Sequence, residues 1–156
     1  MTALIATVVI LQAFNFINGG VFLAFTAMVT PALRDARDPR AAAAVMRDIN
    51  VRAPRSIFMV SFLGAPLAAI IAGVLLATGG VATAATPWII GAIATSLLAF
   101  VISVTVNIPW NNRLEHESDR MPGATWTAFS RVWARANALR CVLSIAAGAA
   151  AAVSLI

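Results

Sequence analysis

The chain has 156 residues, of which 61% are hydrophobic and 11% are charged, and its formal net charge at pH 7 is +5. Soluble domains devote about a quarter of their residues to charged side chains, so this composition excludes a water-soluble globular fold. The 11 basic and 6 acidic residues all lie within two segments, 34–55 and 113–140. Because a charge is costly at the centre of a bilayer and tolerated at its interface, this segregation predicts a multispanning membrane protein. The arginines have no separate soluble domain to occupy, so nucleic-acid binding is not expected.

The stretches without a charged residue are 1–33, 56–112 and 141–156. A spanning helix needs about 20 apolar residues, so the first stretch holds one helix, and the third must be extended by the residues before it. The second stretch is roughly 85 Å long as a helix, nearly three bilayers, and must fold back once. The sequence therefore predicts an all-α integral membrane protein, a single domain of residues 1–156 with four helices in an up-down bundle. The predicted spans are about 4–30, 56–77, 87–108 and 134–155.

The position of the fold-back is indicated by turn and cap residues in the second stretch. Thr78, Gly79 and Gly80 are typical of a helix end. Thr86 followed by Pro87 is typical of a helix start, with proline at the first helical position. The second and third spans are therefore expected to be joined by a short uncharged connection.

The two charged segments predict the orientation, because arginine-rich connections remain in the cytoplasm. The first has six arginines and three aspartates, and the second has five arginines with Glu115, Glu117 and Asp119. We therefore expect a multi-pass protein of the inner (plasma) membrane, with both termini outside and both charged loops in the cytoplasm. The first apolar stretch lacks a preceding basic region and is too long for a signal peptide, so we expect it to be a retained span.

Parts of the charged segments are expected to be short amphipathic helices at the cytoplasmic surface. Asp38 followed by Pro39 is typical of a helix start, and Pro54 is expected to interrupt this helix. Apolar residues recur behind the start at helical spacing, at Ala42, Val45, Met46 and Ile49. A second helical stripe leads into the fourth span and contains Trp126, Phe129, Trp133 and Asn137.

Polar side chains inside the spans are the candidate functional residues, because membrane helices rarely contain them without a partner or a role. Trp133, Asn137 and Arg140 share one face of the fourth helix, at spacings of four and three. Arg140 is expected just inside the hydrocarbon, with no carboxylate in any span to pair with it. Asn107 and Asn111 flank a proline at the end of the third helix, where the proline frees a backbone carbonyl one turn earlier.

The first helix adds Asn15 and Asn18, three residues apart and near Phe22. Each candidate also has a purely structural explanation: asparagines tie membrane helices together, and an arginine extends to lipid phosphate. The tryptophans are then an aromatic belt at the interface. The single Cys141 excludes an intrachain disulfide, and His116, between two glutamates, is expected to be solvated. No metal site or cofactor is predicted.

Short motifs are spread over nearly the whole chain. They are Gly19, Gly20, Val21 and Phe22 with Phe25; Pro31, Ala32 and Leu33; Asn107, Pro109 and Asn111 with Arg113 and Leu114; and Trp133, Asn137 and Arg140. In these motifs the sequence resembles the anthrone-oxygenase-like family of small four-helix membrane proteins, a domain of unknown function in most bacterial members. Some fungal members oxidise anthrones to anthraquinones in polyketide pathways. The resemblance implies fold more directly than function.

The activity implied by this resemblance is the oxidation of a membrane-partitioned phenolic or quinoid compound by dioxygen, without a metal. An anthrone carbanion reacts with dioxygen directly, so the protein's task would be to stabilise the anion in a site of low dielectric constant. The expected catalytic residues are Arg140, Asn107 and Asn137. The expected substrate-binding residues are Asn111, Trp133, Phe22, Asn15 and Asn18. Because the spans contain no side chain suited to act as the base, water or loop carboxylates would have to remove the proton.

The alternative hypothesis is a non-enzymatic membrane binding or assembly protein, in which asparagines lock the bundle and the arginine-rich loops contact anionic lipid or a partner. An enzyme needs a cavity joining Asn107, Asn137 and Arg140, whereas an assembly protein fills that space with side chains. A proton-coupled exporter is disfavoured, since no acid lies within the spans. The expected partners are the lipid bilayer and an apolar aromatic small molecule, and the sequence leaves a homo-oligomer open.

Overall fold

The computed structural model describes residues 1–79, 83–117 and 122–156, and these residues form helices and short connections without a strand. Gly80, expected to help end the second span, and Asp119 of the second charged segment lie outside the described residues. Four helical columns are long and apolar enough to cross a membrane, namely Thr2–Arg34, Phe58–Thr78, Thr86–His116 and Thr125–Val153. The predicted all-α membrane fold with four spanning helices is thereby confirmed.

Two of the four columns contain a π-helical turn. The first consists of α1 (Thr2–Ala24), the π-turn η1 (Phe25–Val29) and α2 (Thr30–Arg34). The second column is α4 (Phe58–Thr78) alone. The third consists of α5 (Thr86–Ile102), the π-turn η3 (Ser103–Asn107) and α6 (Ile108–Glu117), and the fourth is α7 (Pro122–Val153). Much of the second charged segment is therefore helical, and the third and fourth columns extend well beyond the predicted spans.

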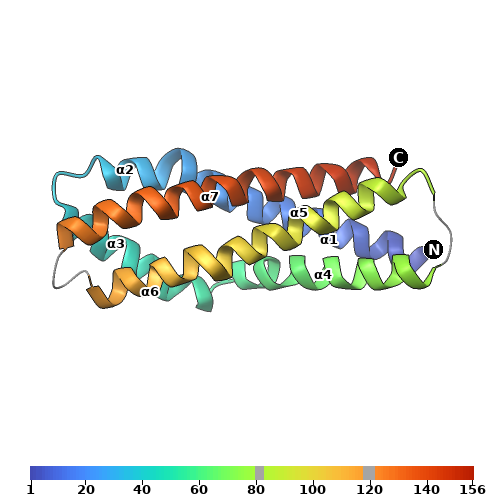
Figure 1. Ribbon diagram of the computed structural model, residues 1–156, viewed down its shortest axis with the longest axis horizontal. Coiled ribbons are helices and arrows are strands. Elements are labelled where there is room, and N and C mark those ends of the chain that lie inside the picture. Colours follow the sequence, from blue (N-terminus) through green and yellow to red (C-terminus); the bar gives the residue numbers. More distant parts are fainter. Residues whose placement is uncertain (80–82, 118–121) are drawn as a thin grey trace.

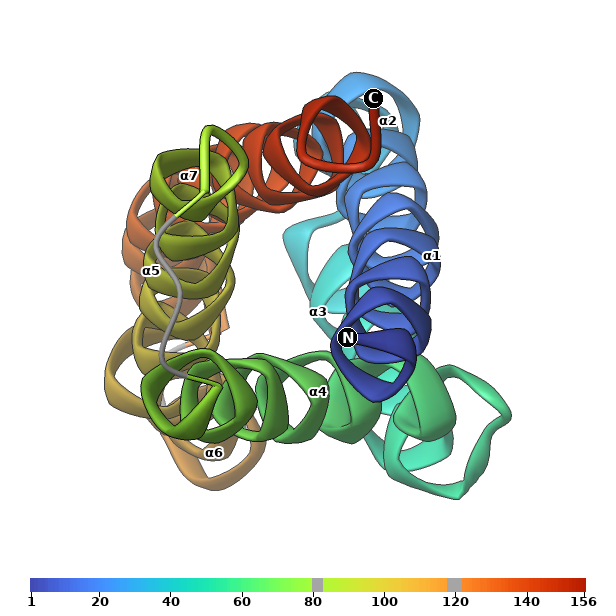
Figure 2. The same cartoon turned by 90° about the vertical axis from the view of Figure 1, so that its right-hand side faces the viewer.

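The four columns form a closed ring. α1 contacts α4 and α7, and α5 contacts the same two helices. Viewed from the end, the columns lie like the sides of a square (Figure 2). The two termini, the end of α4 and the start of α5 lie at one end, and α2, α3 and α6 lie at the other (Figure 1). This arrangement is compatible with the predicted up-down order and places the described parts of the charged segments toward one end.

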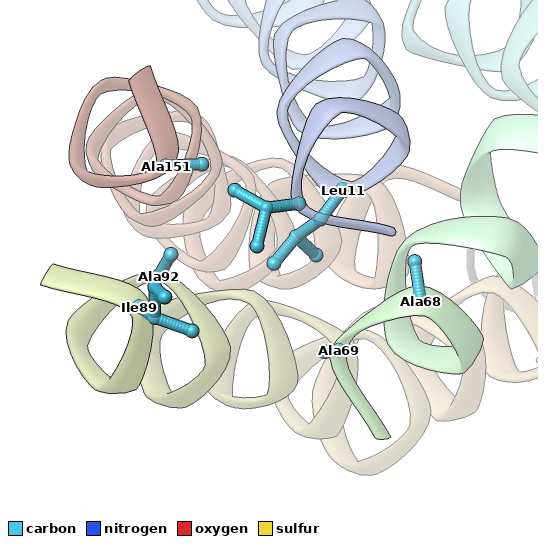
Figure 3. Close-up of a cluster of buried hydrophobic side chains, with 7 residues drawn as sticks. Leu11, Ala68, Ala69, Ile89, Ala92 and Ala151 are labelled. Atoms are coloured by element: carbon cyan, nitrogen blue, oxygen red, sulfur yellow. The ribbon is translucent and has the colours of Figure 1, made fainter. Parts of the chain in front are cut away.

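Small residues allow the columns to pack closely at the end that holds the termini. A buried cluster there consists of Val8 and Leu11 of α1, Ala68 and Ala69 of α4, Ile89 and Ala92 of α5, and Ala151 of α7 (Figure 3). Alanines permit close approach between helix backbones, which is the main source of packing energy where lipid replaces water. Many large apolar side chains are exposed on the outside of the columns instead, such as Leu63, Leu67 and Ile70 of α4, and this suits a lipid-facing surface.

The first charged segment forms the predicted amphipathic helix, α3 (Pro39–Arg52), which ends at the short 3₁₀ turn η2 (Ala53–Arg55). Asp38 caps α3, because its carboxylate accepts a hydrogen bond of 2.8 Å from the backbone N–H of Arg40. The apolar face of α3 is buried within the protein. Its Ala42, Ala43 and Met46 pack in a cluster with Leu114, Trp126, Phe129 and Trp133. α3 therefore packs across the charged end of the ring.

Candidate functional site

A cavity of about 520 Å³ lies at this end, between the columns and α3. It is bordered by the end of α1 with η1, by α3 with η2, by the start of α4, by η3 with α6, and by α7. The lining residues are Val21, Phe22, Phe25, Met46, Ile49, Asn50, Ala53, Pro54, Ser56, Phe58, Met59, Phe62, Ser103, Asn107, Ile108, Asn111, Trp133, Asn137 and Arg140. The cavity falls within the size range of small-molecule sites, and its walls are mostly apolar with a few polar groups.

Arg140 is the charged group of the cavity and is 6% exposed. Its Nη1 donates a 3.0 Å hydrogen bond to Ser103 Oγ, and its Nη2 donates a 2.8 Å hydrogen bond to Asn137 Oδ1. The guanidinium carbon lies 4.2 Å from the centre of the Phe22 ring, within the range of a cation–π contact. Among the described residues no carboxylate pairs with Arg140. A buried cation with neutral partners favours the binding of an anion.

Asn137 is held by two hydrogen bonds to the first column. Its Nδ2 donates to the backbone oxygen of Phe22 and to Thr26 Oγ1, each at 2.8 Å. Thr26 in turn donates to the same Phe22 oxygen at 2.9 Å. Both N–H donors of the amide are directed at α1 and η1, so its oxygen faces Arg140. These hydrogen bonds distinguish the amide nitrogen from the amide oxygen. Asn137 thus orients the guanidinium.

The π-turn η3 presents Ser103 and Asn107 to the cavity. Ser103 Oγ donates a 2.9 Å hydrogen bond to the backbone oxygen of Ala99 and accepts the bond from Arg140. Asn107 Nδ2 donates a 3.3 Å hydrogen bond to the backbone oxygen of Trp133. The turn ends two residues before Pro109, which lacks the N–H that a regular helix would use. Such π-turns are frequent at functional sites.

Five buried side-chain nitrogen or oxygen atoms of the described residues have no hydrogen-bond partner, and all belong to residues that line this cavity. They are Asn50 Nδ2, Asn107 Oδ1, Asn111 Oδ1, Trp133 Nε1 and Arg140 Nε. An unpartnered buried polar group costs about 1 to 3 kcal/mol, so such groups are rare unless they have a function. The set includes both donors and acceptors, and a ligand that carries oxygen atoms and hydroxyl groups complements it.

Aromatic rings form much of the cavity wall. The Phe25 and Trp133 ring centres are 5.6 Å apart, and those of Phe22 and Phe58 are 6.1 Å apart. Phe58 also contacts Phe62, with ring centres 5.5 Å apart. Ring pairs at these separations are attractive, and additional planar rings stack on such walls. The arrangement suits a flat aromatic ligand with polar substituents.

Six of the eight predicted site residues line the cavity: Arg140, Asn107, Asn137, Asn111, Trp133 and Phe22. A cavity joining the first three is the feature expected of an enzyme rather than of an assembly protein. Ser103, Asn50 and Phe25 also line the cavity, although they were not among the predicted site residues. Asn50 gave no separate signal, because a polar residue on an amphipathic helix normally faces solvent. Ser103 could have been found from its position four residues before Asn107.

The remaining two predicted site residues, Asn15 and Asn18, lie outside this cavity and connect helices. Asn15 Nδ2 donates to the backbone oxygen of Leu11 at 2.9 Å and to Ser96 Oγ at 3.1 Å. Asn18 exchanges hydrogen bonds with Ser61, donating to its backbone oxygen at 3.1 Å and accepting from its hydroxyl at 2.8 Å. These contacts between columns account for the burial of both amides without a ligand.

The fold and the cavity define a small helical membrane protein with a partly polar, aromatic-lined site near one end of its bundle. The family model described as anthrone oxygenase matches residues 57–150, and the chain belongs to this family. No curated protein and no solved structure matches the chain. Within the described residues, no group of three His, Cys, Asp or Glu side chains is placed to hold a metal ion.

Proposed function

We propose that the protein is a membrane oxygenase that oxidises a planar phenolic or quinoid compound, similar to an anthrone, with dioxygen. The observation that carries the proposal is the cavity, in which Arg140 has only neutral partners among the described residues and lies against the rings of Phe22 and Trp133. Family membership supports the same reaction class. A compound of this kind partitions into the bilayer and complements both the rings and the unpartnered polar atoms.

The reaction begins with loss of a proton from the methylene carbon of the substrate. The resulting carbanion is delocalised onto the ring-ketone oxygen, so the bound species is an enolate-type oxyanion. Arg140 stabilises this oxygen, and Asn137 keeps the guanidinium in position. The described residues that line the cavity include no carboxylate and no imidazole, so we assign proton removal to water. Because Arg140 binds the anion, the ionisation equilibrium of the substrate shifts toward the anion, and a strong base is not needed.

Dioxygen then adds to the carbanion carbon. This addition forms a C–O bond and gives a peroxide anion, which takes up one proton to become a hydroperoxide. The remaining C–H proton then leaves, the O–O bond breaks, and the hydroxide that departs takes up a proton to become water. The products are a ketone at the former methylene carbon and one molecule of water, so four electrons pass in total from the substrate to dioxygen. Phe22 and Trp133 hold the ring plane during both steps. Asn107 and Asn111 accept hydrogen bonds from ring hydroxyls.

For the location, we propose the inner (plasma) membrane with the charged end in the cytoplasm. The described parts of the charged segments lie toward one end of the ring, and the termini lie at the other (Figure 1). The arginine excess of these segments favours retention on the cytoplasmic side. The cavity then lies in the cytoplasmic half of the bilayer.

Oxygen uptake by the purified protein in lipid nanodiscs, given a hydroxylated anthrone, tests the proposed reaction. We expect uptake above the protein-free rate, a large loss of that excess in Arg140→Ala and Asn107→Ala, and no loss in Asn112→Ala. Asn112 is the matched control, because it lies on the same helix as Asn111 and is exposed. The same excess in all four proteins, or no excess with folded wild type, would contradict the proposal.

A further inference from the structure

The surface helix α3 contributes one polar side chain to the cavity, that of Asn50. Its Nδ2 is buried and has no hydrogen-bond partner among the described residues. Asn50 follows Met46 by one helical turn, and both residues line the cavity. Met46 is 2% exposed and anchors α3 against α6 and α7. The anchoring holds Asn50 against the cavity even though α3 is the part of the wall that lies outside the four columns.

The polar groups of the cavity are distributed along the bundle axis. Ser103 and Arg140 lie at the inner part, and Asn111 lies eight residues beyond Ser103 on the same column. At a rise of about 1.5 Å per residue, the backbones of Ser103 and Asn111 are about 12 Å apart along the helix axis. A ligand that contacts both Arg140 and Asn111 therefore needs several fused or linked rings, with a polar substituent at each end.

Two of the unpartnered atoms outside Arg140, on α3 and α6, are complementary in type. Asn50 has an unpartnered donor and Asn111 an unpartnered acceptor. Rotation of either amide exchanges its donor and acceptor ends but leaves both kinds of group present. A ring hydroxyl both accepts and donates a hydrogen bond, and so it complements two such amides. A ring without a polar substituent leaves both amides without a partner.

We infer that Asn50 is a specificity-determining residue, which together with Asn111 binds a hydroxyl group on the ring remote from the oxygen held by Arg140. The inference deepens the proposed function and rests on it. Asn50 also lies outside the matched residues 57–150, so the family model does not cover this part of the cavity wall. The structure thus assigns the choice among hydroxylated ring systems to α3, and the stabilisation of the anion to the columns.

The test compares the dissociation constants of anthraquinone and 2-hydroxyanthraquinone, which are products or product analogues and do not react. The full chain in nanodiscs is used as wild type, Asn50→Leu, Asn50→Ala and the exposed control Asn112→Leu. We expect the wild type and the control to bind the hydroxylated quinone more tightly. Both Asn50 variants should lose about five- to tenfold in affinity for it, and less than about twofold for anthraquinone, as the loss of one hydrogen bond predicts.

Two results would overturn the inference alone: an equal change for both quinones in the Asn50 variants, or a preference for the hydroxyl that these variants retain. The alanine variant keeps the test valid if leucine disturbs α3, since alanine fits wherever asparagine does. Failure of both quinones to bind to folded wild type would contradict the proposed substrate class, and the inference with it. A preference for the hydroxylated quinone that the Asn50 variants lose, without any oxygen uptake, would contradict the proposed reaction and still support the role of Asn50.

Discussion

Replacing Arg140 by glutamine separates the contribution of this side chain to ligand binding from its contribution to folding. The change removes the 3.0 Å hydrogen bond to Ser103 and the charged donor of the 2.8 Å hydrogen bond to Asn137. Each hydrogen bond to a charged group contributes about 1.5 to 3 kcal/mol. Removal of the charge also relieves its desolvation, an effective penalty of several kcal/mol. These effects oppose each other and are similar in size.

Because the glutamine amide is able to donate to Asn137, we expect Arg140→Gln to change the free energy of unfolding by less than about 2 kcal/mol. Binding of an oxyanion should respond much more strongly. The loss of one charge-assisted contact, about 1.5 to 3 kcal/mol, raises the dissociation constant about 10- to 100-fold. Anthraquinone has no charge and should lose much less affinity than the anion of its hydroxylated derivative.

The assay is equilibrium binding of both ligands to protein in nanodiscs, together with the thermal unfolding transition of each variant. Arg135→Gln is the matched control, since Arg135 lies on the same helix and is exposed. Unchanged affinity of Arg140→Gln for the anion would refute the assignment of Arg140 as the anion-binding group. Severe unfolding of Arg140→Gln with normal behaviour of the control would show that the arginine is a structural element of the bundle.

Two further predictions concern the packing and the orientation of the columns. A Cβ atom added at Gly19 would lie 2.9 Å from Cγ1 of Ile145, whereas one added at Gly20 meets no atom within 4 Å. We expect Gly19→Ala to destabilise the protein by about 1 to 3 kcal/mol, and Gly20→Ala to be neutral or stabilising. Thermal unfolding of both variants measures these effects, and equal effects would contradict the close packing of α1 and α7. Cysteines introduced at Thr83 and Asp48, both exposed, should react with an impermeant reagent from opposite sides of the membrane, and labelling from one side would contradict the topology.

Much of the fold follows from the distribution of charge along the chain. A bilayer excludes charged residues from its centre, so uncharged stretches of known length determine the number of spans. The helical part of the second charged segment was less predictable, because a charged helix is stabilised there by tertiary contacts. Trp126, Phe129 and Trp133 pack with α3 and Leu114, and these contacts depend on elements far away in the sequence.

The two π-turns were not predicted, although they share a sequence feature. Each ends two residues before a proline: η1 before Pro31 and η3 before Pro109. Proline lacks a backbone N–H and disturbs the hydrogen bonding of the preceding turn, and a π-turn is one way for a helix to accommodate this. The sequence predicted the freed carbonyl near Pro109, but the form of the distortion depends on the packing of the columns.

The polar residues of the cavity were predictable where a membrane span made them unusual. Asn107, Asn137 and Arg140 stand out because lipid makes an unexplained polar group costly. Asn15 and Asn18 stand out for the same reason, yet their partners Ser96 and Ser61 lie on other helices, and sequence spacing does not reveal them. Asn50 lies in a charged segment, where a polar side chain is ordinary, so only the three-dimensional structure connects it with the cavity.

The most direct test of the proposed oxygenase is the formation of labelled quinone from a hydroxylated anthrone under ¹⁸O₂. With wild-type protein in nanodiscs, we expect quinone carrying one ¹⁸O atom at the former methylene carbon, formed faster than without protein. Arg140→Gln should form it at about the protein-free rate, and Arg135→Gln at the wild-type rate. Formation of labelled quinone at the same rate with and without folded wild-type protein would contradict the central claim.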